Sequence, residues 1–78
     1  MDTELRGETV KELDRFNAPY GKEVVVQEVS YENGFRLLRF RIREGRRFTI
    51  MDVDSVTAAH WAELMGDWAS AQVEGESN

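Results

Sequence analysis

The clearest chemistry in this sequence lies in a cluster of arginines, because six of the ten basic residues fall within twelve consecutive positions. They are Arg36, Arg39, Arg41, Arg43, Arg46 and Arg47. Hydrophobic residues alternate with them at the period of a β-strand, which predicts a strand pair with one arginine-bearing face and one apolar face. Guanidinium groups neutralise carboxylates and phosphates, so such a face would attract an anionic partner.

We expect the binding surface on the sheet face turned away from any covering helix. The predicted binding residues are Arg39, Arg41, Arg43, Arg47 and Thr49. Leu37, Met51 and Val53 should lie beside them, and a mixture of Arg, Met and aromatic residues is typical of interface cores. The sequence therefore favours a protein-interaction surface for an unidentified protein or other anionic partner. The competing interpretation is a solvated outer face with Glu28 as counter-ion.

The alternative function is single-stranded nucleic-acid binding. Arginines would neutralise phosphates while Phe35 and Tyr31 stack on bases. However, the chain carries a net charge of -5. Residues 35–49 hold six arginines and one glutamate, a net +5, whereas residues 52–78 hold six acidic residues and no Lys or Arg. This segregation predicts surfaces of opposite sign that pair within one molecule, between two copies or with a charged partner.

Catalysis and metal binding find little support in the sequence. His60 is the only histidine and there is no cysteine, so neither a metal cluster nor a Ser-His-Asp arrangement is recognisable. Asp52 and Asp54 alternate at the end of a predicted strand, but two carboxylates alone are weak evidence for a cation site. We predict a protein that is not an enzyme, with no catalytic residues, no metal and no cofactor.

The length of the chain limits its stability, and the pattern of its apolar and charged residues predicts its location. A domain of 78 residues buries only about 60% of the surface that its unfolded chain exposes, so a second subunit would help to stabilise it. We therefore expect a homodimer. The sequence contains no run of eighteen apolar residues, and its N-terminus alternates acidic and basic residues. These features predict a cytoplasmic protein with no membrane partner.

The predicted architecture is an α+β fold. It consists of a three-stranded antiparallel meander with one C-terminal helix packed on one face, preceded by a short N-terminal helix or arm. Residues 1–18 would form the arm, mobile over 1–8 and helical over 9–17, because Val10, Leu13 and Phe16 recur at helical intervals. Residues 19–72 would form the single domain, with strands over 23–31, 35–43 and 46–53. Residues 73–78 read as a disordered acidic tail.

The strand registers are predicted from the turn residues and from the alternation of side chains between the two faces of each strand. A three-residue loop of Arg43, Glu44 and Gly45 would pair Phe40 with Phe48 and Arg41 with Arg47, which separates charge from hydrocarbon; a two-residue loop at Glu44-Gly45 would mix them. We adopt the former. In the first hairpin, a type I′ turn at Asn33-Gly34 would pair Val29 with Leu38, Val25 with Ile42 and Glu28 with Arg39. A one-residue bulge at Gly34 would instead place Val24 and Val26 inside; we adopt the type I′ register.

The last helix is predicted from Ser55 to about Gln72, with Asp54 or Ser55 as its N-cap. Trp61, Leu64, Met65 and Trp68 form an apolar stripe, which should lie across Leu38, Phe40, Phe48 and Ile50. Gly66 costs about 1 kcal/mol relative to Ala in a helix interior, which indicates a close approach to a strand or to another helix.

The run from Glu23 to Asp54, with its Arg-Glu-Gly-Arg-Arg-Phe stretch at residues 43–48 and the helix bearing Trp61 and Trp68, resembles a short uncharacterised bacterial family, typically proteobacterial. The resemblance covers about residues 19–70 and implies a domain of unknown function. More distantly, a meander that feeds one long helix resembles the repeats of Pur-alpha-type and Whirly-like single-strand binders. Those repeats work as intertwined pairs, so this likeness implies dimerisation more than nucleic-acid binding.

Overall fold

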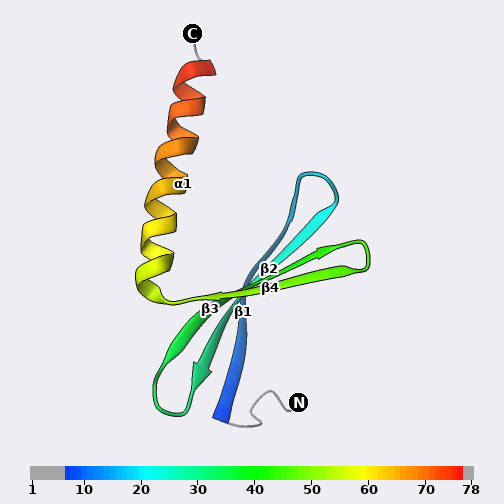
Figure 1. Ribbon diagram of the computed structural model, residues 1–78, viewed down its shortest axis with the longest axis vertical. Coiled ribbons are helices and arrows are strands. Elements are labelled where there is room, and N and C mark those ends of the chain that lie inside the picture. The colour runs from blue at the N-terminus through cyan, green and yellow to red at the C-terminus, as the bar shows by residue number, and fades with distance from the viewer. Residues whose placement is uncertain (1–6, 77–78) are drawn as a thin grey trace.

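A computed structural model describes residues 7–76, which form one four-stranded antiparallel sheet followed by one helix (Figure 1). The elements are β1 (Glu8–Ala18), β2 (Lys22–Tyr31), β3 (Arg36–Glu44), β4 (Arg47–Val53) and α1 (Ser55–Glu76). The strands lie in the sheet in chain order, so the sheet is a meander. The predicted α+β class, antiparallel sheet and C-terminal helix are confirmed, but the predicted number of three strands is wrong.

The N-terminal segment is a strand and not the predicted helix over 9–17. β1 pairs with β2 along its whole length, and an isolated helix of two turns would be marginal by comparison. The register shifts between Glu12 and Asp14, so Leu13 is the extra residue of a β-bulge. The bulge puts Val10 and Phe16 on opposite faces of the sheet. Period-two alternation is therefore interrupted in the sequence, and the apolar residues resemble a helical stripe.

The chain ends fall only partly within the described residues. The predicted mobile segment 1–8 overlaps them at Gly7 and Glu8, and Glu8 opens β1. The predicted acidic tail 73–78 overlaps them at residues 73–76, which continue α1 instead of forming a disordered tail. Residues 1–6 and 77–78 lie outside the described part of the chain.

The hairpin between β2 and β3 follows the alternative register, in which the bulge lies at Gly34. Glu32, Asn33 and Gly34 form the loop, and Gly34 has a φ of 90° that suits glycine. The backbone amide of Tyr31 donates to the carbonyl oxygen of Phe35 at 2.9 Å, which closes the loop. Val29 therefore pairs with Leu37, Val25 with Arg41 and Glu28 with Leu38. The adopted type I′ register is wrong, and Val24 and Val26 lie beneath the helix.

The hairpin between β3 and β4 matches neither weighed register. Its two-residue loop is Gly45-Arg46, with Glu44 opposite Arg47, and Gly45 has a φ of 61°. Glycine at the first loop position is the signature of a type II′ turn, whose twist suits a hairpin. The loop pairs Phe40 with Met51 and Arg41 with Ile50. Consequently every side chain of β4 lies on the face opposite to the predicted one, because strand side chains alternate.

The sheet has two distinct faces. The helix face, on which α1 lies, carries mainly apolar side chains: Phe16, Val24, Val26, Leu38, Phe40, Ile42, Thr49, Met51 and Val53. The arginine face carries Arg15, Glu23, Val25, Gln27, Leu37, Arg39, Arg41, Arg43, Phe48, Ile50 and Asp52. The prediction that Leu38 and Phe40 face the helix is therefore supported by the register, whereas Phe48 and Ile50 lie on the other side.

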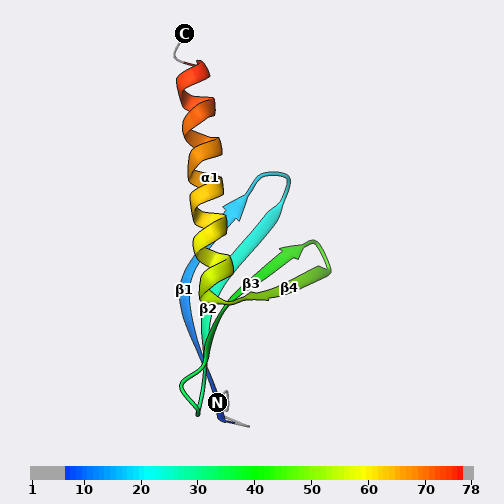
Figure 2. The same ribbon diagram turned by 60° about the vertical axis from the view of Figure 1, so that its left-hand side comes forward.

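α1 begins with the predicted cap, since the Asp54 carboxylate accepts a hydrogen bond from the Thr57 backbone amide at 2.8 Å. Its first turns lie over β3, where the ring centroids of Trp61 and Phe40 are 6.2 Å apart. The rest of the helix runs beyond the sheet in both views (Figures 1 and 2). Trp68 is 66% exposed, so only Trp61 of the two tryptophans covers the sheet.

Few side chains of one chain are buried. The core consists of Val24, Val25, Val29 and Val53, whereas many large apolar residues are exposed. The radius of gyration is 15.6 Å, against about 11–12 Å for a compact domain of this length. Among the described residues, no helix has the length and hydropathy that crossing a bilayer requires.

Candidate binding surface on the arginine face

The structure brings together three of the five predicted binding residues. Arg39, Arg41 and Arg43 project from alternate positions of β3 onto the arginine face. Arg47 and Thr49 lie on the helix face, so the prediction that they share the arginine surface is wrong. The cause is the two-residue Gly45-Arg46 loop, which shifts β4 relative to the predicted register.

Arg39 forms an ion pair within the sheet. Its Nε donates to one carboxylate oxygen of Asp52 at 2.8 Å and its Nη2 to the other at 3.1 Å. A third contact joins Nη1 to the Glu8 carboxylate of β1 at 3.6 Å. The hydrogen bonds from Arg39 lower the pKa of Asp52 below its usual value. Arg39 therefore connects β3 to both edge strands of the sheet, and its positive charge is already neutralised.

Arg43 belongs to a second, more exposed network. Its guanidinium group contacts Glu23 at 3.2 Å, and Arg15 of β1 contacts the same carboxylate at 3.1 Å. Arg15 also pairs with Glu12 at 2.9 Å. Hydrogen bonds from Arg15, and then from Arg43, lower the pKa of Glu23. Such exposed pairs contribute little to stability, but they hold these side chains in place around a hollow.

Arg41 differs from its neighbours on β3, because no described residue gives it an ion pair. Its guanidinium carbon lies 5.7 Å from the centroid of the Phe48 ring, a cation–π contact across the strand pair. Together with Arg15, Glu23, Val25, Arg43 and Phe48, it lines a hollow of about 220 Å³. Arg41 is thus the guanidinium group on this face that is best placed to receive an external anion.

Sequence reasoning missed the apolar part of this surface. Phe48 and Ile50 are each 56% exposed and lie beside Arg41 instead of under the helix. It also missed Asp52 and Glu23 as the counter-ions, a role that it gave to Glu28. The usable signal was Gly45, because a glycine at the first position of a two-residue loop favours a type II′ turn. That turn alone gives the observed pairing.

The aromatic residues expected to stack on bases lie away from Arg41. Tyr31 and Phe35 stack on each other, with ring centroids 6.1 Å apart, beside the loop between β2 and β3. Arg41 is five residues beyond Arg36 on β3, which corresponds to about 16 Å along a strand. The described residues therefore do not place these rings next to the available guanidinium group.

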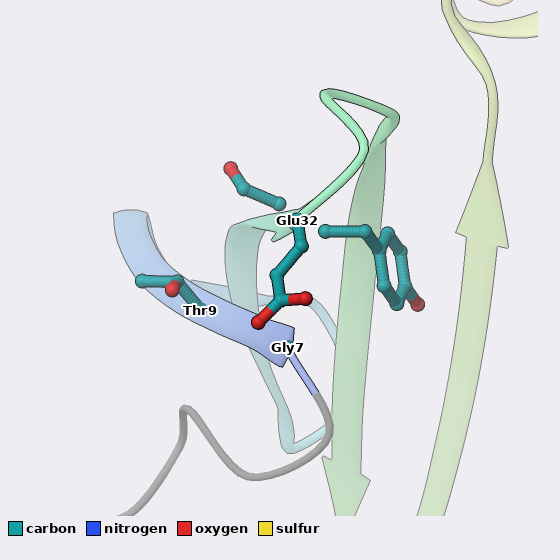
Figure 3. Close-up of a pocket in the computed structure, with 5 residues that line it drawn as sticks. Gly7, Thr9 and Glu32 are labelled. Carbon is teal, nitrogen blue, oxygen red and sulfur yellow. The ribbon is translucent and has the colours of Figure 1, made fainter.

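A second hollow lies where β1 begins, and Figure 3 shows the Glu32 side chain lying over Gly7. Its volume is about 280 Å³, and its lining residues are Gly7, Thr9, Ser30, Tyr31 and Glu32. A Cβ atom at Gly7 would lie 2.7 Å from Cγ of Glu32, and Gly7 has a φ of 72°. Glycine at position 7 therefore lets the Glu32 side chain pack directly against the backbone just before β1. Within residues 7–76 no group of three or more His, Cys, Asp or Glu residues could hold a metal ion.

Comparison with known proteins identifies a family whose biochemical function is unknown. The model of a family of unknown function (DUF6967) matches residues 7–71. No curated protein and no solved structure matches the chain. The matched segment contains all four strands and most of α1.

Proposed function

The chain belongs to the family of unknown function DUF6967, and from its geometry we propose that it is a non-enzymatic interaction module. In this proposal its arginine face binds an acidic segment of a partner protein, and the module works as a homodimer. The cytoplasmic location expected from the sequence is part of the same proposal.

The observation that carries the proposal is the position of Arg41. It is exposed, it has no ion pair with a described residue, and it lies opposite Ile50 and beside Phe48. A guanidinium group binds a carboxylate through two parallel hydrogen bonds, and the adjacent apolar side chains can cover a hydrophobic residue of the same partner. An acidic peptide with interspersed apolar residues matches this surface.

The carboxylate in the hollow supports a binding role over a catalytic one. Two guanidinium groups hold Glu23, and they lower its pKa. At neutral pH this group is therefore ionised, so it is a poor proton donor, and its low basicity makes it a poor general base. Instead, the Glu23 carboxylate holds Arg15 and Arg43 in place at the hollow that Arg41 also lines.

Fluorescence anisotropy with a labelled peptide of alternating glutamate and leucine tests the proposal. We expect binding whose affinity falls as salt rises, and a loss of at least tenfold in Arg41→Glu. Arg47→Glu is the matched control, because it makes the same charge change on the opposite face of the sheet. Affinity in that variant should remain within about threefold of wild type. Equal losses in the two variants would mean general charge attraction and would contradict a site at Arg41.

Short single-stranded DNA and RNA oligonucleotides form the second arm of the experiment. Arg41 beside an aromatic ring also suits a phosphate next to a base, which is the specific observation in favour of this alternative. Oligonucleotide binding that is lost in Arg41→Glu, without any peptide binding, would replace the first proposal with a nucleic-acid-binding function. Tyr31 and Phe35, the rings expected to stack on bases, lie away from Arg41, and this argues for the peptide.

A further inference from the structure

The helix face has its own unfilled space, separate from the arginine face. Between α1 and the sheet lies a hollow of about 450 Å³ with an almost wholly apolar lining. It is lined by Phe16, Val24, Leu38, Phe40, Ile42, Thr49, Met51, Ala58, Trp61, Ala62 and Met65. Phe16 is 46% exposed and Met51 is 42% exposed, so the helix of the same chain leaves part of this face open to water.

The apolar stripe of α1 is also uncovered from Leu64 onward. Leu64, Met65 and Trp68 are each more than half exposed and belong to one helical stripe. Figures 1 and 2 show this half of the helix rising beyond the sheet. One chain thus exposes two apolar surfaces: an open sheet face, and a helix stripe that shares a hollow with the sheet at Met65 and extends beyond it to Trp68.

The total exposed area indicates how much surface a partner would cover. The chain exposes 6394 Å² and has a mass of 9.0 kDa. A compact folded monomer of that mass exposes about 4,900 Å², so the excess is roughly 1,500 Å². Each partner in a standard protein interface buries about 800 Å². The excess is enough for one such interface.

We propose that a second copy of this chain covers the helix face, with the second half of its α1 lying in the open hollow and Trp68 as the central side chain. The inference rests on the homodimer proposed above and assigns its interface. In a twofold-symmetric pair each chain gives its helix stripe to the sheet of the other, so one contact covers both exposed surfaces. A small apolar ligand would fill the hollow but leave Leu64 and Trp68 uncovered.

The contact uses the face of the sheet opposite to Arg39, Arg41 and Arg43. The arginine faces would therefore remain on the outside of such a dimer, where they stay free to bind the acidic partner proposed above.

Sedimentation equilibrium on the full chain, with Trp68→Glu and the matched variant Ser70→Glu, tests the interface. Both changes add a carboxylate to the same turn of α1, but residue 70 lies on the side of the helix away from the stripe. We expect wild type and Ser70→Glu to be dimers and Trp68→Glu to dissociate at least a hundredfold more readily, whether or not the released monomer stays folded. A Trp68→Glu dimer as tight as wild type would overturn the interface while leaving the homodimer intact. A wild-type monomer at millimolar concentration would overturn both.

Tryptophan fluorescence gives a readout that does not depend on a disruptive variant. In Trp61→Phe the remaining tryptophan is Trp68, which is 66% exposed in one chain. Burial against a second copy should shift its emission to shorter wavelength, and the shift should disappear on dilution through the dissociation range. Emission that stays red and independent of concentration, together with binding of an apolar dye by the monomer, would instead mark the hollow as a ligand site. Peptide binding through Arg41 is measured separately, so failure of this inference leaves that test unaffected.

Discussion

Arg39 and Asp52 face each other across β3 and β4 and form two hydrogen bonds, at 2.8 and 3.1 Å. Their side chains are 22% and 30% exposed, so among the described residues this ion pair and the pair that Arg39 makes with Glu8 are the two least exposed. Because β4 is an edge strand and lies next to α1 in the chain, this pair helps to fix the strand from which the helix begins.

Replacing Asp52 with Asn should lower the free energy of unfolding by about 1 kcal/mol, since a partly buried guanidinium group loses its charged partner. For a domain of this size the melting temperature should fall by about 4–8 °C. Thermal denaturation followed by circular dichroism measures the change. Glu23→Gln is the control, because both ion pairs that it breaks involve an arginine at least half exposed, so it should shift the melting temperature much less. If the two variants melt at the same temperature, the partial burial of Arg39 adds nothing to the strength of its ion pair.

The same pair gives stability a pH dependence. The folded-state pKa of Asp52 is lowered, so its contribution is fully present above the unfolded value, near 3.9, and is lost as pH falls through the folded value. Urea denaturation from pH 6 down to pH 2 should show wild type losing stability more steeply below about pH 4 than Asp52→Asn. Parallel curves for the two proteins in that range would contradict a lowered pKa.

Gly66→Ala should stabilise the protein by about 1 kcal/mol, because alanine is the better helix former. A Cβ atom at Gly66 would meet nothing within 4 Å inside one chain, so the close approach expected from the sequence is not present there. Chemical denaturation measures the gain, and Ala69→Gly should show a loss of similar size. A destabilised Gly66→Ala protein would mean that a second chain packs against this position.

Tyr20→Asn should stabilise the loop between β1 and β2. Tyr20 has a φ of 67°, a left-handed conformation that is unfavourable for a bulky side chain and easier for asparagine, and the residue is 90% exposed. The expected gain in unfolding free energy is about 0.5–1 kcal/mol. Tyr20→Phe retains the strained backbone and should be neutral. A loss in Tyr20→Asn would show that the tyrosine ring stabilises the loop, for example through Lys22, which lies 5.8 Å from its centroid.

Much of the sheet could be predicted because hydrophobic alternation and turn residues act locally. Such signals predict the strands equivalent to β2, β3 and β4 and the helix cap at Asp54. They also place Arg39, Arg41 and Arg43 on one face of β3 and Phe40 on the other. β1 could not be recognised, because its bulge at Leu13 removes the alternation and leaves a spacing typical of a helix.

The makeup of the candidate site depended on a single loop residue. β4 lies three positions from the predicted register, because Met51 and not Phe48 is opposite Phe40. Any odd shift exchanges Phe48 and Ile50 with Thr49 and Met51 between the faces, and local propensity is the same in either case. Charge and hydrocarbon share one face here because a guanidinium group packs well against an aromatic ring, as Arg41 does on Phe48. Mixing the two on one face is therefore not unfavourable.

The meander also sets the order in which the protein can fold. Each strand pairs only with its neighbours in the chain, through loops of two to four residues, so the sheet requires little loop-closure entropy. Hairpins can close within one chain before any second copy arrives. Refolding by stopped-flow should then show a fast phase with a rate independent of protein concentration. For the proposed homodimer, a slower bimolecular phase should follow in which the tryptophan signal changes.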